Sequence, residues 1–388
     1  MTLRRVASVP IVTGVAATLA RMESLHLEPH VASARDEILE RLRVWLEIPS
    51  ISCDPAYADA VRDSAAWCEA EMQECGLEGT RLLETPLHPA VYGEWLHAGP
   101  DAPTVLVYGH HDVQPVDPLD LWTSPPFEAT IRDGQLFARG AVDDKGQVLY
   151  HLEVVRALLA RDGALPVNLK FVIEGEEEFG SPNFEALLVQ HADLLACDVV
   201  VVSDTGMLSV DEPSMCVGMR GLAGFDIHLR SASTDLHSGV FGGAVLNPAH
   251  LAARIAAALH DAEGRVTVPG FYDRVRDLTS AERDAMDALP YDEAEFRRNA
   301  GGAPLGGESG RSTFERTGSR PTAEVVGLHS GYAGDGIKTI VPATANLKVT
   351  FRLVPDQEPD EIAAAFLAWL REQVPDGVDC HEIGRAHV

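Results

Sequence analysis

Basic residues are scarce in this 388-residue sequence. Lys and Arg together number 31, whereas Asp and Glu number 59, so the formal net charge at pH 7 is −28. A chain with this charge repels phosphate groups, which argues against nucleic acid or an anionic membrane as a partner. Hydrophobic residues make up 46% of the sequence, so the acidic excess does not indicate disorder. The length predicts two folded domains, or three.

Cysteine is infrequent as well. The six cysteines form no CxxC pair and no zinc-type cluster, so we expect reduced thiols and a cytoplasmic protein. No apolar run is long enough to span a bilayer. The sequence contains no HExxH zinc-helix pattern, no GxxxxGK[ST] phosphate loop and no GxSxG nucleophile elbow.

The first residues have an ambiguous character. Arg4 and Arg5 precede an apolar stretch at 6–20, as in a short signal peptide. No clean small-residue cleavage site follows that stretch. We therefore favour a coding start placed too early, with Met22 opening the natural chain and residues 1–21 forming an extension.

The first half of the chain alternates between helical and strand patterns, which predicts an α/β sheet covered on both faces. The strands at 104–108 and 198–202 are continuous apolar runs, typical of strands buried on both sides. The expected helices are 34–47, 61–75, 146–161 and 183–190, and the other expected strands are 91–96 and 167–173.

The pattern changes near Val217. From there the order is strand, helix, strand, strand, helix, strand, which is the order of a ferredoxin-like α+β unit. A Gly- and Ser-rich stretch at 299–321 is expected to be a long loop. We therefore expect one domain at 22–216 and a second at 217–382. The expected strands are 222–230, 323–328, 344–353 and one near 378, and the expected helices are 248–262 and 359–373.

Four polar clusters follow or flank the predicted strands of the first domain, where α/β enzymes place their sites. They are GHHDVQP at 109–115, RGAVDDKG at 139–146, EGEEEFGS at 174–181 and SDTG at 203–206. Each cluster also has a simpler explanation, because solvated turns and helix caps are rich in the same residues. Together they bring one histidine and several carboxylates to one sheet edge, a ligand set that suits zinc, with manganese or cobalt as alternatives.

Within the first cluster, side-chain alternation places His110 and Asp112 on one face while His111 points away. A metal-bound imidazole commonly donates its second N–H to a carboxylate. His110 as a ligand oriented by Asp112 satisfies that arrangement. Asp143 and Asp144 open a helix, so a capping role is the alternative for that pair.

In this order, the clusters resemble the motifs of the M20 family of metallopeptidases, in particular its carnosinase-like and bacterial dipeptidases. GHHDVQP resembles the H-x-D motif, RGAVDDKG the bridging-aspartate motif and EGEEEFGS the paired-glutamate motif. The resemblance implies an α/β catalytic domain with a mixed sheet flanked by helices, plus an inserted ferredoxin-like lid and dimerisation domain. It further implies two divalent metal ions, with zinc the first candidate. His110, Asp143 and Asp204 would hold one ion, and Asp143 and Glu178 the other.

The resemblance also implies roles for other residues. Glu177 would be the general base and acid, and Asp112 would orient His110. TDLHSGVFGG resembles the lid motif whose histidine, here His237, reaches the partner subunit's site in a homodimer and helps to bind substrate and oxyanion. FRLVP resembles the motif whose arginine, here Arg352, binds the substrate's carboxylate.

The implied activity is metal-dependent hydrolysis of dipeptides, with a small peptide as the partner. One alternative is an N-acyl amino-acid amidohydrolase on the same scaffold. Another, of a different class, is a non-catalytic protein that binds metal or dimerises. Glu177 argues against the second alternative, because a binding scaffold needs no general base.

The end of the sequence departs from the family pattern. There is no GGSIP-type segment, and neither His381 nor His387 stands in the context of the histidine that completes the second metal site. Residues 383–388 (IGRAHV) match the translation of a common sequencing adapter, which predicts a non-native tail. We therefore expect a chain without the C-terminal return of its catalytic domain. Such a chain would expose apolar sheet edges and have low activity or solubility.

Overall fold

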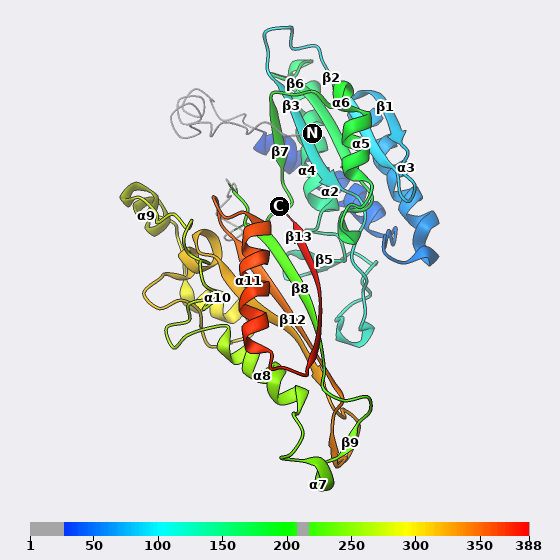
Figure 1. Cartoon of the computed structure of the whole chain (residues 1–388). Coiled ribbons are helices and arrows are strands. Elements are labelled where there is room, and N and C mark those ends of the chain that lie inside the picture. Colours follow the sequence, from blue (N-terminus) through cyan, green and yellow to red (C-terminus); the bar gives the residue numbers. More distant parts are fainter. Residues whose placement is uncertain (1–26, 208–215, 217, 388) are drawn as a thin grey trace. The chain divides into compact units, whose positions relative to one another are not determined.

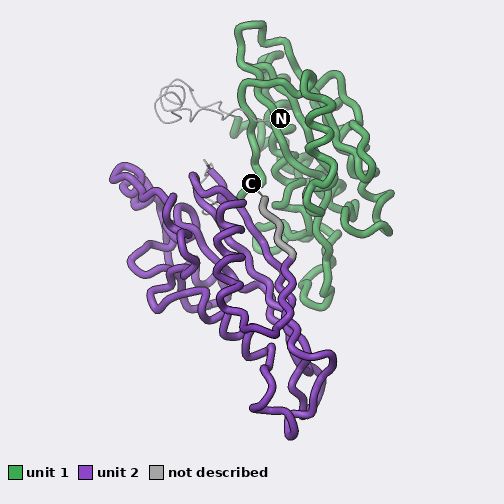
Figure 2. The backbone as a smooth tube through the Cα atoms, viewed as in Figure 1, with its two compact units in different colours: residues 1–206 green, residues 207–388 purple. Residues whose placement is uncertain are grey.

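The computed structural model describes residues 27–207, 216 and 218–387, with side chains up to 382. The chain divides into two compact units, Met1–Gly206 and Met207–Val388 (Figure 2). The expected extension at 1–21 lies outside the described residues. The expected domain boundary near 217 falls beside residues 208–215 and 217, which also lie outside them.

Unit 1 contains a five-stranded mixed sheet, which confirms the mixed sheet that the family resemblance implies and adds β1 to the four strands predicted from the sequence. Its strand β3 runs parallel to β6 and β7, whereas β2 is antiparallel to β1 and β6. The carboxyl ends of β3, β6 and β7 therefore share one edge of the sheet. The strand order is β1 (Glu78–Leu83), β2 (Ala90–Trp95), β6 (Asn168–Glu174), β3 (Thr104–His110), β7 (Val199–Val202).

Helices cover both faces of this sheet (Figure 1). Trp45, Met72 and Leu152 come from three helices and share one core with Val107 and Phe171. The opposite core is formed by the alternate residues of the same strands, together with two short helices. The first face carries α2 (Glu28–Leu46), α3 (Ala58–Glu74) and α4 (Lys145–Asp162), and the second carries α5 (Phe184–Gln190) and α6 (Ala192–Leu195).

The prediction that 198–202 is buried on both faces is wrong. Val199, Val200 and Val202 in β7 are 50%, 55% and 44% exposed. The reason is position, because β7 is an edge strand that pairs with β3 alone among the described strands. A continuous valine run is therefore compatible with an exposed edge, and the sequence also led us to expect exposed apolar edges on this sheet.

Unit 2 is built on a four-stranded antiparallel sheet with two helices packed on one face. Along its strands, residues such as Phe225 and Leu347 point inward and pack with Phe366 and Trp369 of the covering helix. This is the predicted ferredoxin-like arrangement. The sheet order is β10 (Thr322–Ser330), β12 (Thr344–Leu353), β8 (Gly221–Arg230), β13 (Asp379–His387), and the helices are α8 (Pro248–Ala258) and α11 (Pro359–Gln373).

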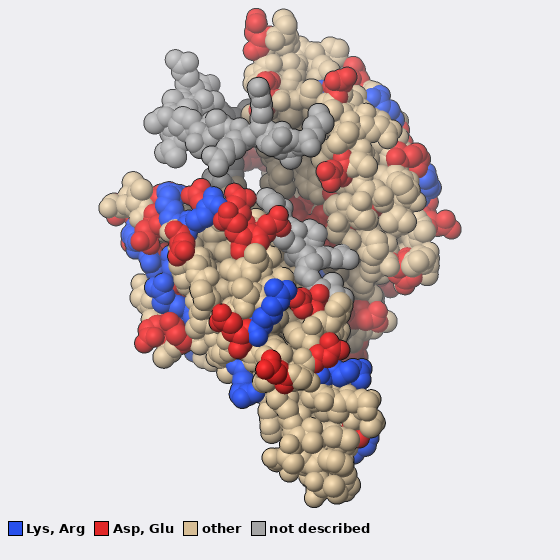
Figure 3. Space-filling model, in the orientation of Figure 1, with Lys and Arg blue, Asp and Glu red and all other residues tan. Residues whose placement is uncertain are grey.

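Smaller elements complete the described chain. The stretch 299–321 is mostly loop, as predicted, but it also contains a short π-helical turn where Ser312 N–H bonds to the Glu315 side chain. None of the described helices combines the length and hydrophobicity that a bilayer crossing requires. On the visible face, Lys and Arg are interspersed with Asp and Glu (Figure 3). The smaller elements are β4 (Thr130–Arg132), β5 (Gln135–Phe137), β9 (Leu236–His237), β11 (Ile340–Val341), α7 (Ser238–Phe241), α9 (Ser280–Asp287), α10 (Glu293–Asn299), the π-helix Glu315–Ser319 and the 3-10 turns Pro55–Tyr57, Leu119–Leu121 and Glu177–Phe179.

Candidate active site

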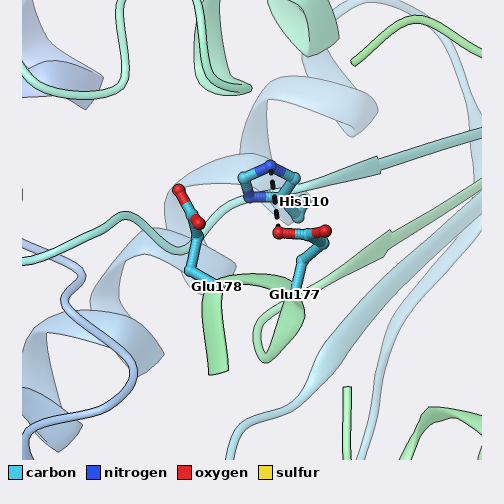
Figure 4. A group of neighbouring side chains, drawn as sticks. All are labelled: His110, Glu177 and Glu178. Atoms are coloured by element: carbon cyan, nitrogen blue, oxygen red, sulfur yellow. Dashed lines mark ion pairs between the residues drawn. The ribbon is translucent and has the colours of Figure 1, made fainter. Parts of the chain in front are cut away.

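The polar clusters of unit 1 meet at the carboxyl edge of its sheet. His110 ends β3 and lies in register with Glu174, the last residue of β6. Two groups of potential ligand atoms surround its imidazole, each within 4.8 Å of one another: His110 with Asp143 and Asp204, and His110 with Glu177 and Glu178 (Figure 4). The sheet topology therefore gathers residues that are far apart in sequence around one buried histidine.

The His110 ring presents one nitrogen to this group of carboxylates. Its Nε2 lies 3.1 Å from Asp143 Oδ1, 3.7 Å from Asp204 Oδ2 and 4.0 Å from Glu177 Oε2. Burial disfavours the charged imidazolium, but the surrounding carboxylates outweigh burial and raise the pKa of His110 well above its usual value. The Nε2 side of the ring is therefore surrounded by carboxylates.

The other ring nitrogen faces Asp112. His110 Nδ1 lies 3.1 Å from the Asp112 backbone oxygen and 3.4 Å from its Oδ1, and both side chains are fully buried. Burial opposes ionisation of Asp112, but the bond with His110 lowers its pKa below the usual value. Its Oδ2 accepts the Glu178 backbone N–H at 3.0 Å. Asp112 thus connects the histidine with the acidic turn after β6.

The capping interpretation of the Asp143–Asp144 pair is wrong for Asp144. This residue occupies the N-cap position of α4 but makes no capping bond with its side chain. Instead its Oδ2 accepts the His110 backbone N–H at 3.1 Å, and burial raises its pKa to about 7. A Cβ at Gly109 would lie 2.6 Å from that same oxygen, so the close approach requires glycine there.

His111 points away from the site, as side-chain alternation predicts. Its Nε2 lies 2.9 Å from the Pro89 backbone oxygen, and burial lowers its pKa to about 4. A Cβ at Gly175 would meet the ring at 2.7 Å. His111 therefore packs the base of the site as a neutral side chain.

Within the described part of the chain, His110 is the one basic side chain that forms ion pairs with the site carboxylates. Among the described residues, no lysine or arginine forms an ion pair with Asp143, Glu177, Glu178 or Asp204. Burial raises the pKa of Glu178 to about 7 and that of Glu177 above its usual value.

Two features of this arrangement fit a divalent cation. An imidazole nitrogen with several carboxylate oxygens is a ligand set for zinc or manganese. The site carboxylates also have no ion-pair partner among the described lysines and arginines. A cation at this edge would offset the excess negative charge.

Several residues support the site without having been assigned a role from the sequence. Gln114 donates its amide to Glu178 Oε2 at 2.6 Å and to the Glu178 backbone oxygen at 3.2 Å. The buried Lys145 ammonium donates to the backbone oxygens of Trp45 and Ile48, at 3.0 and 2.8 Å, and so fixes the start of α4. Both lie inside the quoted motifs, so motif membership was the only available signal.

The two site residues expected from the second domain lie on different elements of unit 2. His237 ends β9, and its Nδ1 accepts the Gly239 N–H at 3.0 Å while the residue stays exposed. Arg352 lies on β12, opposite Thr322 and Leu222, and is exposed. Within the described residues, Arg352 makes no hydrogen bond or ion pair.

Comparison with known proteins agrees with this geometry. The family model described as Peptidase family M20/M25/M40 matches residues 106–382. The Cys-Gly metallodipeptidase dug1 of Schizosaccharomyces pombe is 32% identical over 340 residues, covering 84% of this chain and 71% of that protein. The Beta-Ala-His dipeptidase of Homo sapiens is 32% identical over 335 residues, covering 83% and 66%. The structure of the M20 family metallo-carboxypeptidase Sso-CP2 from Sulfolobus solfataricus has a TM-score of 0.78 at 34% identity, covering 90% and 78%. The chain therefore belongs to the M20/M25/M40 peptidase family, as the motif resemblance predicts.

Proposed function

We propose that this protein hydrolyses the peptide bond of dipeptides with the help of divalent metal ions. The observation that carries the proposal is the buried His110 ring, which faces several carboxylates that form no ion pair with a lysine or arginine of the described residues. Membership of the family and relatives named as dipeptidases support it.

The geometry of the site supports a proposed set of metal ligands. His110, Asp143 and Asp204 would hold one ion, and their ligand atoms lie within 4.8 Å of one another. Asp143 and Glu178 would contribute to a second ion, as the family resemblance implies, although the structure groups Glu178 with His110 and Glu177. A zinc or other divalent ion bound there would polarise the scissile carbonyl of the substrate and lower the pKa of a bound water. Asp112 keeps the His110 ring oriented, because it engages Nδ1 and leaves Nε2 facing the site.

Glu177 is the proposed proton carrier. It lies 4.0 Å from His110 Nε2 at the edge of the cluster, and burial raises its pKa. A carboxyl group whose pKa is raised toward neutrality can take a proton from water and return it to the leaving amine. Replacing Glu177 therefore separates proton transfer from metal binding.

Unit 2 supplies the proposed substrate contacts. Arg352 is exposed and free of partners among the described residues, and a guanidinium pairs with a carboxylate through two parallel hydrogen bonds. Every dipeptide carries such a carboxylate. We propose that His237 acts on the oxyanion in the partner's site of a homodimer. The six free cysteines support a reducing, cytoplasmic compartment.

The test is a substrate panel with and without Glu177→Gln. Dipeptides should be hydrolysed in preference to N-acetyl and N-succinyl amino acids, and a chelator should abolish the activity. Glu177→Gln should lower kcat about 10²- to 10⁴-fold while metal content stays constant. Preference for N-acyl substrates would indicate the amidohydrolase alternative, and undiminished hydrolysis by Glu177→Gln would contradict the proposed base.

A further inference from the structure

Asp204 is the site residue with the least secondary structure around it. It follows β7, an edge strand, and lies in a segment that is neither helix nor strand. Its Oδ2 nevertheless lies 3.7 Å from His110 Nε2, and its side chain is 31% exposed. Something other than a regular element must hold this carboxylate toward the histidine.

Two side chains of α4 hold the residues on either side of Asp204. Gln147 Nε2 donates to the Thr205 backbone oxygen at 3.3 Å. His151 Nε2 lies 2.6 Å from Ser203 Oγ. Gln147 and His151 are one helical turn apart, so they lie on the same face of α4. One face of α4 thus contacts the residue before Asp204 and the residue after it, and these two contacts fix the position of Asp204.

The same helix positions the other side of the site. α4 begins directly after Asp143 and Asp144, and Asp144 accepts the His110 backbone N–H. Lys145 anchors this helix start to the backbone oxygens of Trp45 and Ile48. One rigid element therefore determines the separation of Asp143 from the segment that carries Asp204.

The surroundings of His151 suit a fixed, neutral contact. The Tyr150 ring packs on the imidazole with centroids 4.3 Å apart. Burial lowers the pKa of His151 to about 4, so the ring stays uncharged near neutral pH. A neutral ring can hold the Ser203 hydroxyl without adding a positive charge beside the proposed cation site.

We propose that Gln147 and His151 are positioning residues that hold Asp204 in the metal site through its neighbours Thr205 and Ser203. This inference rests on the proposed function, because it concerns the same ligands. Residues that orient metal ligands without touching the metal typically contribute about 10- to 100-fold to metal affinity.

Calorimetric titration of the full chain with Zn²⁺ or Mn²⁺ tests the proposal. His151→Ala and Ser203→Ala should each weaken one metal-binding step about 10- to 100-fold. The double variant should be no weaker than either single variant, because both remove the same contact. His151→Gln should restore much of the affinity, since its amide can reach the hydroxyl. His97→Ala is the matched control, because His97 pairs with Glu78 in unit 1 and touches no site residue.

Additive effects of His151→Ala and Ser203→Ala, or unchanged titrations, would overturn the proposal. Gln147→Ala provides a second variant should His151→Ala fold poorly, with the same expected loss. Hydrogen exchange of the metal-free chain gives a readout independent of activity. Backbone amide exchange across 199–207 should be faster in His151→Ala than in wild type and unchanged in His97→Ala. Equal exchange rates in His151→Ala and wild type would also overturn the proposal that α4 holds Asp204. A wild-type chain that neither binds metal nor hydrolyses dipeptides would instead refute the proposed function.

Discussion

The two units surround their partly or fully buried carboxylates in opposite ways. At the sheet edge of unit 1, Asp143, Glu177 and Asp204 lie within 4.0 Å of His110, and no arginine or lysine of the described residues pairs with them. In the long loop of unit 2, Arg320 forms a bidentate pair with Glu308, with distances of 2.7 and 2.8 Å. Both side chains of that pair are buried.

The electrostatic consequences are also opposite. Burial raises the pKa of Glu178 in unit 1 to about 7. Glu315 in unit 2 is buried as well, but the Ser312 N–H and the Arg311 side chain outweigh burial and lower its pKa. The comparison teaches that the partner, and not the carboxylate, distinguishes a site that attracts a cation from a contact that stabilises a loop.

The largest expected effect comes from removing the histidine that both ligand groups share. His110→Ala should abolish tight metal binding and lower dipeptide hydrolysis by more than about 10³-fold, because metal assistance is worth several kcal/mol in the transition state. Metal analysis and steady-state kinetics measure the two effects. His97→Ala should change neither. Full metal content in His110→Ala would contradict the assignment of this edge as the metal site.

The second effect is on folding and should appear only in unit 2. Glu308→Gln should destabilise the protein by about 3–5 kcal/mol, since it leaves the buried Arg320 guanidinium without its charge partner. Urea unfolding measures the loss. Replacing the pair together, with Glu308→Leu and Arg320→Met, should recover much of it, because neither charge of the buried pair then remains. Metal content should be unchanged in both variants. A loss of metal would contradict the assignment of the Arg320–Glu308 pair to stability alone and of the unit 1 carboxylates to metal binding.

The smallest effect concerns pH, and it should have opposite signs in the two regions. Glu178 has a folded pKa of about 7 against about 4.3 in an unfolded chain, so its contribution to stability is present below about pH 4 and is lost as pH rises to about 7. Glu315 has a lowered folded pKa, so its contribution is present above about pH 4 and is lost as pH falls.

Unfolding of the metal-free chain at several pH values checks this contrast. Relative to wild type, Glu178→Gln should gain stability as pH rises from about 4 to 7. Glu315→Gln should be less stable than wild type at neutral pH, with a deficit that shrinks in acid. Equal pH dependence in the two variants would show that burial, and not the partner, dominates both sites.

Much of this arrangement could be predicted because its signals are local. The strands β3 and β6 were predicted from their sequences, and the polar residues that follow them meet at one edge because the two strands run parallel. The side-chain alternation around His110 was also sufficient to predict that His111 points away from the site. These inferences need only the period of a strand and the direction of the chain.

Other features could not be read in that way. The valine run of β7 looks like a buried strand, but its edge position leaves it exposed. Asp144 lies at the start of a helix and looks like a cap, yet its side chain accepts a hydrogen bond from the backbone N–H of His110 at the end of β3. Contacts between residues far apart in sequence decide both cases, and no local pattern reports them.

The sequence by itself determined the residue types of the site, their order along the chain and the two folding patterns, because hydrophobic periodicity and motif spacing are local properties. Only the tertiary structure decided which carboxylates remain without a basic partner and which helix face holds Asp204. Partner choice depends on distances of 2.6–3.7 Å between atoms of β3, of α4 and the turn before it, and of the segment after β7. Those distances arise only when the strands pair and the helix packs against them.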